Sequence, residues 1–200
     1  MAFAVMLAVL QPGETAAQGS VCEGGFGEQS VVGSGAAEDP KAPVFQYIGV
    51  DKCKLCHIKK STGAPYSQWK KTKHAKAFET LATPEAKAIA EKLKIADPQK
   101  SDQCLRCHVT GFGAKPEEIA PSLKQSEGVG CEVCHGPGSE YHKEDVHAKS
   151  REAGLKAGMI IPDEKTCLKC HNKDSPSYKE FDFAKFSKEI AHPNPEKQKK

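Results

Sequence analysis

The sequence predicts a mostly α-helical fold with little or no β-sheet. Apolar residues recur at helical spacing in three segments, and no segment shows the apolar and polar alternation of a half-buried strand. Hydrophobic residues make up 38% of the 200 positions and aromatic residues 6%, so side chains alone would form a thin core at this length. We therefore expect another component to complete the core.

A repeated motif identifies that component. The pattern Cys-x-x-Cys-His occurs at Cys53–His57, Cys104–His108, Cys131–His135 and Cys167–His171. Two thiols in this pattern form thioethers with a porphyrin, and the adjacent imidazole ligates its iron, so each copy predicts one covalently bound c-type haem. Zinc sites and redox dithiols also use Cys-x-x-Cys pairs, but here histidine directly follows every pair. The expected haem-attachment residues are Cys53, Cys56, Cys104, Cys107, Cys131, Cys134, Cys167 and Cys170, and the expected proximal iron ligands are His57, His108, His135 and His171.

The N-terminal region is expected to lie outside the haem domain. Residues 1–17 begin with an apolar run too short to span a bilayer and end in small residues, as an export signal does, although the usual basic start is missing. Residues 18–43 are rich in Gly, Ser and Ala and predict a flexible linker, in which Cys22 stands apart from the motifs. We expect the haem domain at 44–193, a Lys-rich tail at 194–200, and a periplasmic or otherwise exported protein without a transmembrane helix.

The first predicted helix of the haem domain covers residues 67–81. It places His74, Phe78 and Leu81 on one face, because they are spaced four and three residues apart. A histidine on this apolar face is a candidate distal ligand of a haem iron.

Further helices and turns follow. Residues 84–95 predict a helix with Thr83 as its N-cap and an apolar stripe of Ala86, Ile89 and Leu93. Glycines at 111–113, 128–130 and 136–138 predict tight turns beside the motifs, which would also let the backbone approach a porphyrin. A last amphipathic helix is expected at 183–190.

The histidine count bears on what the irons can do. Four histidines lie outside the motifs and are candidate distal ligands: His74, His142, His147 and His192. Bis-histidine ligation of all four haems is numerically possible, and Met159 is the one methionine outside the N-terminal region. Iron with two protein ligands transfers electrons, whereas iron with an open position can bind a substrate. Four closed haems and three closed haems with one open haem both remain alternatives.

Charge composition argues against a nucleic-acid partner. The net charge is +3, and the chain has 27 lysines but only two arginines, Arg106 and Arg151. Bidentate phosphate recognition favours arginine. The lysines are better explained as a solvated surface that contains a docking site for a redox partner.

The chain resembles the tetrahaem cytochrome c-554 family. The resemblance rests on Trp69 and the run 73–77 after the first motif, on residues 109–113 after the second motif, and on residues 128–138 around the third motif. It covers roughly residues 47–172 and extends more weakly to His192. It implies a mostly α-helical fold built around four closely stacked haems.

The resemblance also implies a ligand set. His74 would ligate the fourth-motif haem, the histidine after the third motif would ligate the first-motif haem, and His192 would ligate the third-motif haem. The second-motif haem would be five-coordinate. His147 fits the family pattern better than His142, and closure of the second-motif haem by His142 is an alternative.

Three functions are compatible with these features. Electron transfer between redox proteins is the main hypothesis, with a multihaem oxidoreductase as donor and a cytochrome or quinone-linked acceptor implied by the resemblance. Reduction of a small nitrogen oxide at an open haem would make the protein an enzyme. Assembly into an extracellular cytochrome filament is the third alternative. The sequence contains no other catalytic constellation.

Overall fold

The computed structural model describes residues 43–195 of the chain. These residues belong to one compact unit, Ala42–Lys200. The predicted export signal, the linker with Cys22 up to residue 42, and residues 196–200 of the predicted tail lie outside the described residues.

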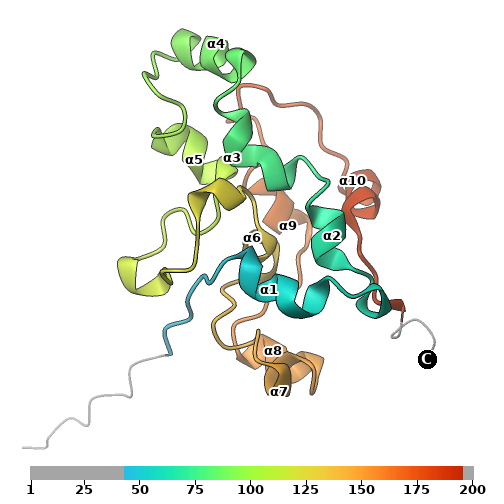
Figure 1. The fold of residues 1–200 in the computed structure, drawn as a ribbon. Helices are drawn as coiled ribbons and strands as arrows, with labels where there is room; N and C mark the ends of the chain where they lie inside the picture. The colour runs from blue at the N-terminus through green and yellow to red at the C-terminus, as the bar shows by residue number, and fades with distance from the viewer. Residues whose placement is uncertain (1–42, 196–200) are drawn as a thin grey trace, which may run out of the picture. The chain divides into compact units, whose positions relative to one another are not determined.

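Short helices joined by turns make up the described part of the chain (Figure 1). The α-helices are α1 (Val50–His57), α2 (Pro65–Trp69), α3 (Ala77–Thr80), α4 (Pro84–Lys92), α5 (Asp102–His108), α6 (Cys131–His135), α7 (Glu144–His147), α8 (Arg151–Lys156), α9 (Glu164–Leu168) and α10 (Phe183–Ile190). Single 3₁₀ turns lie at Lys60–Thr62, His74–Lys76, Pro116–Glu118 and Gln125–Glu127.

The prediction of a helical fold without a sheet is confirmed for these residues. Their one β-type contact is an isolated bridge between Tyr47 and Ile119. No helix among the described residues is long and apolar enough to cross a membrane.

The predicted continuous helix at 67–81 is wrong. The structure has α2, a turn at 70–73, the 3₁₀ turn at His74–Lys76 and then α3. A distant residue occupies a backbone group that a helix would use, because the His74 carbonyl accepts a hydrogen bond from the Val129 amide (3.0 Å). The Trp69 indole also anchors this segment by donating to the Val129 carbonyl (2.8 Å). The Thr72 hydroxyl also donates to the Trp69 carbonyl at 2.7 Å. These bonds hold the break in place.

The helix after Thr83 begins as predicted but ends early. The Thr83 hydroxyl accepts a hydrogen bond from the Ala86 amide (3.2 Å), as an N-cap does. α4 ends at Lys92 instead of residue 95 because Lys94 takes a left-handed conformation (φ 58°). The predicted apolar stripe is also partly wrong, since Ala90 is the buried residue of α4 and Leu93 is 46% exposed.

The last helix agrees with the sequence, and each predicted glycine-rich turn, including 111–113, contains a glycine with positive φ. α10 spans the predicted residues, with the Asp182 carboxylate capping the Lys185 amide at 3.0 Å. Gly128 and Gly136 both have positive φ, and a Cβ at Gly128 would lie 2.7 Å from the His74 carbonyl oxygen. The close approach at Gly128 is therefore to backbone.

The protein core is small. One cluster of buried residues joins Leu81 to Leu105 and Val109, with Phe78 and Cys104 against it. The most deeply buried side chain among the described residues is a carboxylate, Glu132. This agrees with the expectation that side chains alone give this chain little core.

Two buried carboxylates hold the start of α1. Glu132 accepts hydrogen bonds from the Ile48, Gly49 and Gly138 amides at 2.7–3.1 Å. Glu127 accepts one from the Val50 amide at 2.9 Å, while its second oxygen is buried without a hydrogen-bond partner. Both carboxylates are buried, which nothing in the local sequence indicates.

Replacing Glu127 with glutamine should stabilise the protein at neutral to alkaline pH. Burial raises the pKa of Glu127, so the folded state favours the protonated form and stability falls as pH rises through the raised pKa. The neutral amide avoids this penalty. We expect a gain of about 1 kcal/mol near pH 8 and almost none near pH 4. Urea unfolding at both pH values measures it, and equal effects at the two pH values would contradict the assignment.

Candidate haem sites

The four motifs sit at helix ends. α1, α5 and α6 each end on the motif histidine, while the fourth motif begins in α9 and continues three residues beyond it. A helical turn brings the two cysteines of a motif to the same side, with the histidine one residue further on. All eight motif cysteines are free thiols and intermediate or exposed. They are therefore available for thioether bonds.

The structure brings the motifs next to one another through their cysteines. The thiols of Cys53 and Cys131 lie close enough to shift each other's pKa, which places the first motif beside the third. Burial and the neighbouring Cys107 raise the pKa of the Cys170 thiol, which places the second motif beside the fourth.

The third and fourth motifs meet as well. Burial, and next the neighbouring Cys167, raise the pKa of the Cys134 thiol to about 11. The motifs thus form one series of neighbours in the order first, third, fourth, second.

Two pairs of histidines face each other. The His74 and His171 rings have centroids 6.0 Å apart at an interplanar angle of 72°, and the His135 and His192 rings have centroids 5.9 Å apart at 75°. Each pair joins a motif histidine to a histidine outside the motifs. Since metal–imidazole bonds are about 2.0 Å long, two imidazoles on opposite sides of one metal have ring centroids about 6 Å apart.

These histidines favour the form that binds metal. Burial, and then the charge of His171, lower the pKa of His74. Burial, and then the charge of His192, lower the pKa of His135. Neutral imidazole is the metal ligand, so both environments suit iron ligation.

The other candidate histidines are placed as follows. The Nδ1–H of His108 donates to the Ala77 carbonyl at 2.6 Å, which leaves Nε2 as the ligating nitrogen. The Nδ1–H of His142 donates to the Gly138 carbonyl at 2.9 Å. Burial raises the pKa of the Glu132 carboxyl, and the nearby His142 ring offsets part of that rise. His57 ends α1 and His147 ends α7, and the side chain of His147 lies outside the described residues.

The surroundings of the motifs fit a large apolar cofactor. Each motif has an exposed large apolar side chain within it or beside it: Ile58 after the first, Phe112 after the second, Ile160 bonded to the His135 carbonyl, and Leu168 in the fourth. A porphyrin at each motif would cover such surface. Zinc would need three or four converging ligands, and no three His, Cys, Asp or Glu side chains converge in the described part of the chain.

An aromatic stack that sequence reasoning missed adjoins the fourth motif. The Phe181 ring lies 4.7 Å from the His171 ring at 17°, and Phe186 stacks on Phe181 at 5.5 Å and 16°. Phe186 belongs to α10, whose amphipathic pattern was the available signal. The stack fixes the plane of the His171 imidazole.

Comparison with known proteins agrees with the motifs. A family model described as cytochrome c554 and c-prime matches residues 52–136. The fourth motif and His192 lie beyond the part that this family model matches.

A curated relative extends the similarity. Cytochrome c-554 of Nitrosomonas europaea is 37% identical over 142 residues, which is 62% of this chain and 57% of that protein. The chain thus matches little more than half of its relative's length. No solved structure matches the chain significantly.

Proposed function

We propose that the protein is an exported electron carrier with four c-type haems, one at each Cys-x-x-Cys-His motif. The contact series between motif cysteines is the observation that carries this proposal. Cys53 adjoins Cys131, Cys134 adjoins Cys167, and Cys170 adjoins Cys107. Because these sulfurs would be bonded to the haems, the haem edges would come together in the order first, third, fourth, second. Such a continuous series suits electron transfer.

The proposed distal ligands are His74 for the fourth-motif haem, His192 for the third and His147 for the first. The two centroid separations near 6 Å support the first two assignments. When bound, haem supplies one-electron redox chemistry, and the chain holds the imidazoles and excludes water. We propose that the second-motif haem has an open position and that His142 is not a ligand.

The proposed location and partners follow from the chemistry of attachment. Covalent haem attachment takes place outside the cytoplasmic membrane, which supports a periplasmic location. As the family resemblance implies, the protein would take electrons from a multihaem oxidoreductase and pass them to a cytochrome or quinone-linked acceptor.

Haem counting with redox titration tests the proposal. Purified holoprotein should contain about four haems per chain by pyridine haemochrome assay, and all should be reduced and reoxidised reversibly in a spectroelectrochemical cell. Fewer than four haems, or haems that do not return to the oxidised state, would contradict it.

A reductase function has no structural support of its own. The hollow of about 570 Å³ beside α4 is lined partly by Lys87, Glu91 and Asp97, and neither cysteine nor histidine lines it. Turnover of nitric oxide by the reduced protein at a rate above that of free haem would favour that alternative.

A further inference from the structure

The positive charge of the chain is concentrated in one segment. Residues 51–78 contain eight lysines and a single acidic residue, Asp51, whereas the whole chain has a net charge of +3. The rest of the sequence is therefore net negative, at −4. All eight lysines are exposed: Lys52, Lys54, Lys59, Lys60, Lys70, Lys71, Lys73 and Lys76. We call them the basic surface.

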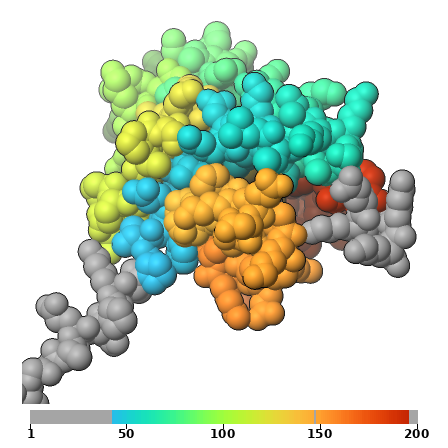
Figure 2. Space-filling model, turned by 60° about the horizontal axis from the view of Figure 1, so that its bottom comes forward, coloured from blue at the N-terminus to red at the C-terminus, as the bar shows by residue number. Residues whose placement is uncertain are grey.

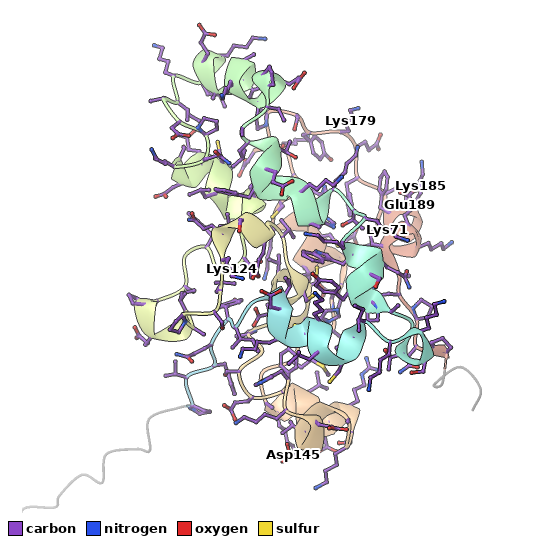
Figure 3. All side chains as sticks on the ribbon, in the orientation of Figure 1. Lys71, Lys124, Asp145, Lys179, Lys185 and Glu189 are labelled. Carbon is purple, nitrogen blue, oxygen red and sulfur yellow. The ribbon has the colours of Figure 1, made fainter. Side chains whose placement is uncertain are left out.

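Contacts gather these lysines on α1, α2 and the turns beside them. α1 packs on α2, and Lys54 and Lys70 both act on Asp51, which Lys124 also pairs at 2.8 Å. Figure 2 shows the blue-green residues of this segment together on one face, and Figure 3 labels Lys71 and Lys124. The one acidic group is thus already neutralised by lysine.

Two aromatic rings hold lysines of the basic surface. The Lys54 ammonium lies 5.6 Å from the centre of the Tyr66 ring, and the Lys70 ammonium lies 5.8 Å from that of Trp69. Cation–π contacts of this kind reduce the freedom of a long side chain. The charges are therefore partly preorganised.

The first haem motif lies inside the basic surface. Cys53, Cys56 and His57 are interspersed with Lys52 and Lys54 on α1. Leu55, between the two cysteines, is 72% exposed, and Ile58 is 47% exposed. A haem attached here would lie beside a small apolar spot ringed by positive charge.

This combination fits an acidic protein better than other anionic partners. Lysines around an apolar spot favour a fast encounter that is weakened by salt, which suits electron exchange. Nucleic-acid recognition favours arginine, and both arginines lie outside this surface. A membrane surface would call for an apolar helix face, and α1 has only one buried residue and little amphipathic character.

We infer that the basic surface is the docking site for an acidic redox protein and that electrons exchange there through the first-motif haem. The inference rests on the proposed electron-carrier function and adds the site and the kind of partner. With the first motif at one end of the series of motifs, the second motif would be the far end of the path.

Charge reversal at two positions tests the inference. We would replace Lys54→Glu and Lys70→Glu together, and use Lys87→Glu with Lys92→Glu on α4 as a control of equal charge change. α4 lies at the top of Figure 1, away from α1. The probe is flavodoxin hydroquinone, a small acidic electron-donor protein, and stopped-flow absorbance follows haem reduction.

At low ionic strength the K54E/K70E variant should react about 10-fold more slowly than the unmodified holoprotein, and the control less than about 2-fold more slowly. High salt should bring all rates together, because it screens the attraction. Equal slowing in both variants would overturn the inference. Lys54→Gln with Lys70→Gln should give an intermediate loss if charge reversal impairs folding.

Two further measurements separate the explanations. Sedimentation with phosphatidylglycerol vesicles should detect no binding that depends on Lys54 and Lys70. The inference would be overturned if K54E/K70E lost vesicle binding while its rate of reaction with flavodoxin stayed unchanged, because the basic surface would then bind membranes. Small redox mediators should still reduce every haem of both variants. Failure of that titration in the unmodified protein would instead contradict the electron-carrier function.

Discussion

Replacing His74 with alanine should open the fourth-motif haem and add a high-spin ferric signal of about one haem per chain. The His74 and His171 rings are separated by the distance expected for two ligands of one iron. Without His74, the iron would keep only His171. A weaker axial field converts low-spin iron to high-spin and changes the reduction potential of that haem. Electron paramagnetic resonance of the oxidised protein measures the spin states.

A matched substitution makes this result specific. His142→Ala removes a histidine outside the motifs whose ring bonds the Gly138 carbonyl, and it should leave the spin states unchanged. Added imidazole should restore the low-spin signal in His74→Ala, because it can occupy the opened position. An unchanged spectrum in His74→Ala would refute the assignment, and a new high-spin haem in His142→Ala would show that the two histidines had been assigned wrongly.

The motifs were predictable because they are local. Five consecutive residues carry both attachment sulfurs and one iron ligand, so the sequence alone predicts their chemistry. The break inside residues 67–81 was not predictable, because it depends on Val129, more than fifty residues away. The Val129 amide donates to the His74 carbonyl, and the Val129 carbonyl accepts from the Trp69 indole. The spacing of apolar residues indicates which side of a helix is buried. It does not indicate whether a distant residue will take a hydrogen bond that the helix would otherwise form.

The histidine pairs show the same limit. Spacing alone left four unassigned histidines, and only the family resemblance linked His74 to the fourth motif and His192 to the third. The structure brings each of these histidines to the expected motif histidine. The identity of the ligands remains a prediction for the spin-state measurements.

The buried carboxylates could not be found from the sequence. Glu132 lies between two cysteines of a motif, where local composition gives no hint of burial. Its role comes from the amides of Ile48 and Gly49, which belong to a distant segment. A carboxylate with three amide donors replaces helix-capping side chains that the start of α1 lacks.

Replacing Glu132 with alanine should therefore destabilise the folded holoprotein by about 3–5 kcal/mol. The substitution leaves the Ile48, Gly49 and Gly138 amides without their acceptor. Burial raises the pKa of Glu132, which shows that the buried charge carries a desolvation penalty. Replacing the carboxylate with alanine removes that penalty and offsets part of the loss in stability. The cost of leaving three buried amides without an acceptor is larger than this gain, because the amides stay buried and water cannot replace the carboxylate.

Guanidinium unfolding followed by circular dichroism measures this loss, with haem content checked first in each variant. Glu152→Ala is the control, since that glutamate is 77% exposed and pairs only with Lys156 on the surface. We expect it to change stability by less than about 0.5 kcal/mol. Glu132→Gln keeps one acceptor oxygen and should fall between the two. If Glu132→Ala unfolds like the control, this carboxylate does not hold the segment before α1, and the hydrogen bonds of Gln46, Tyr47 and Ile48 with other segments are sufficient.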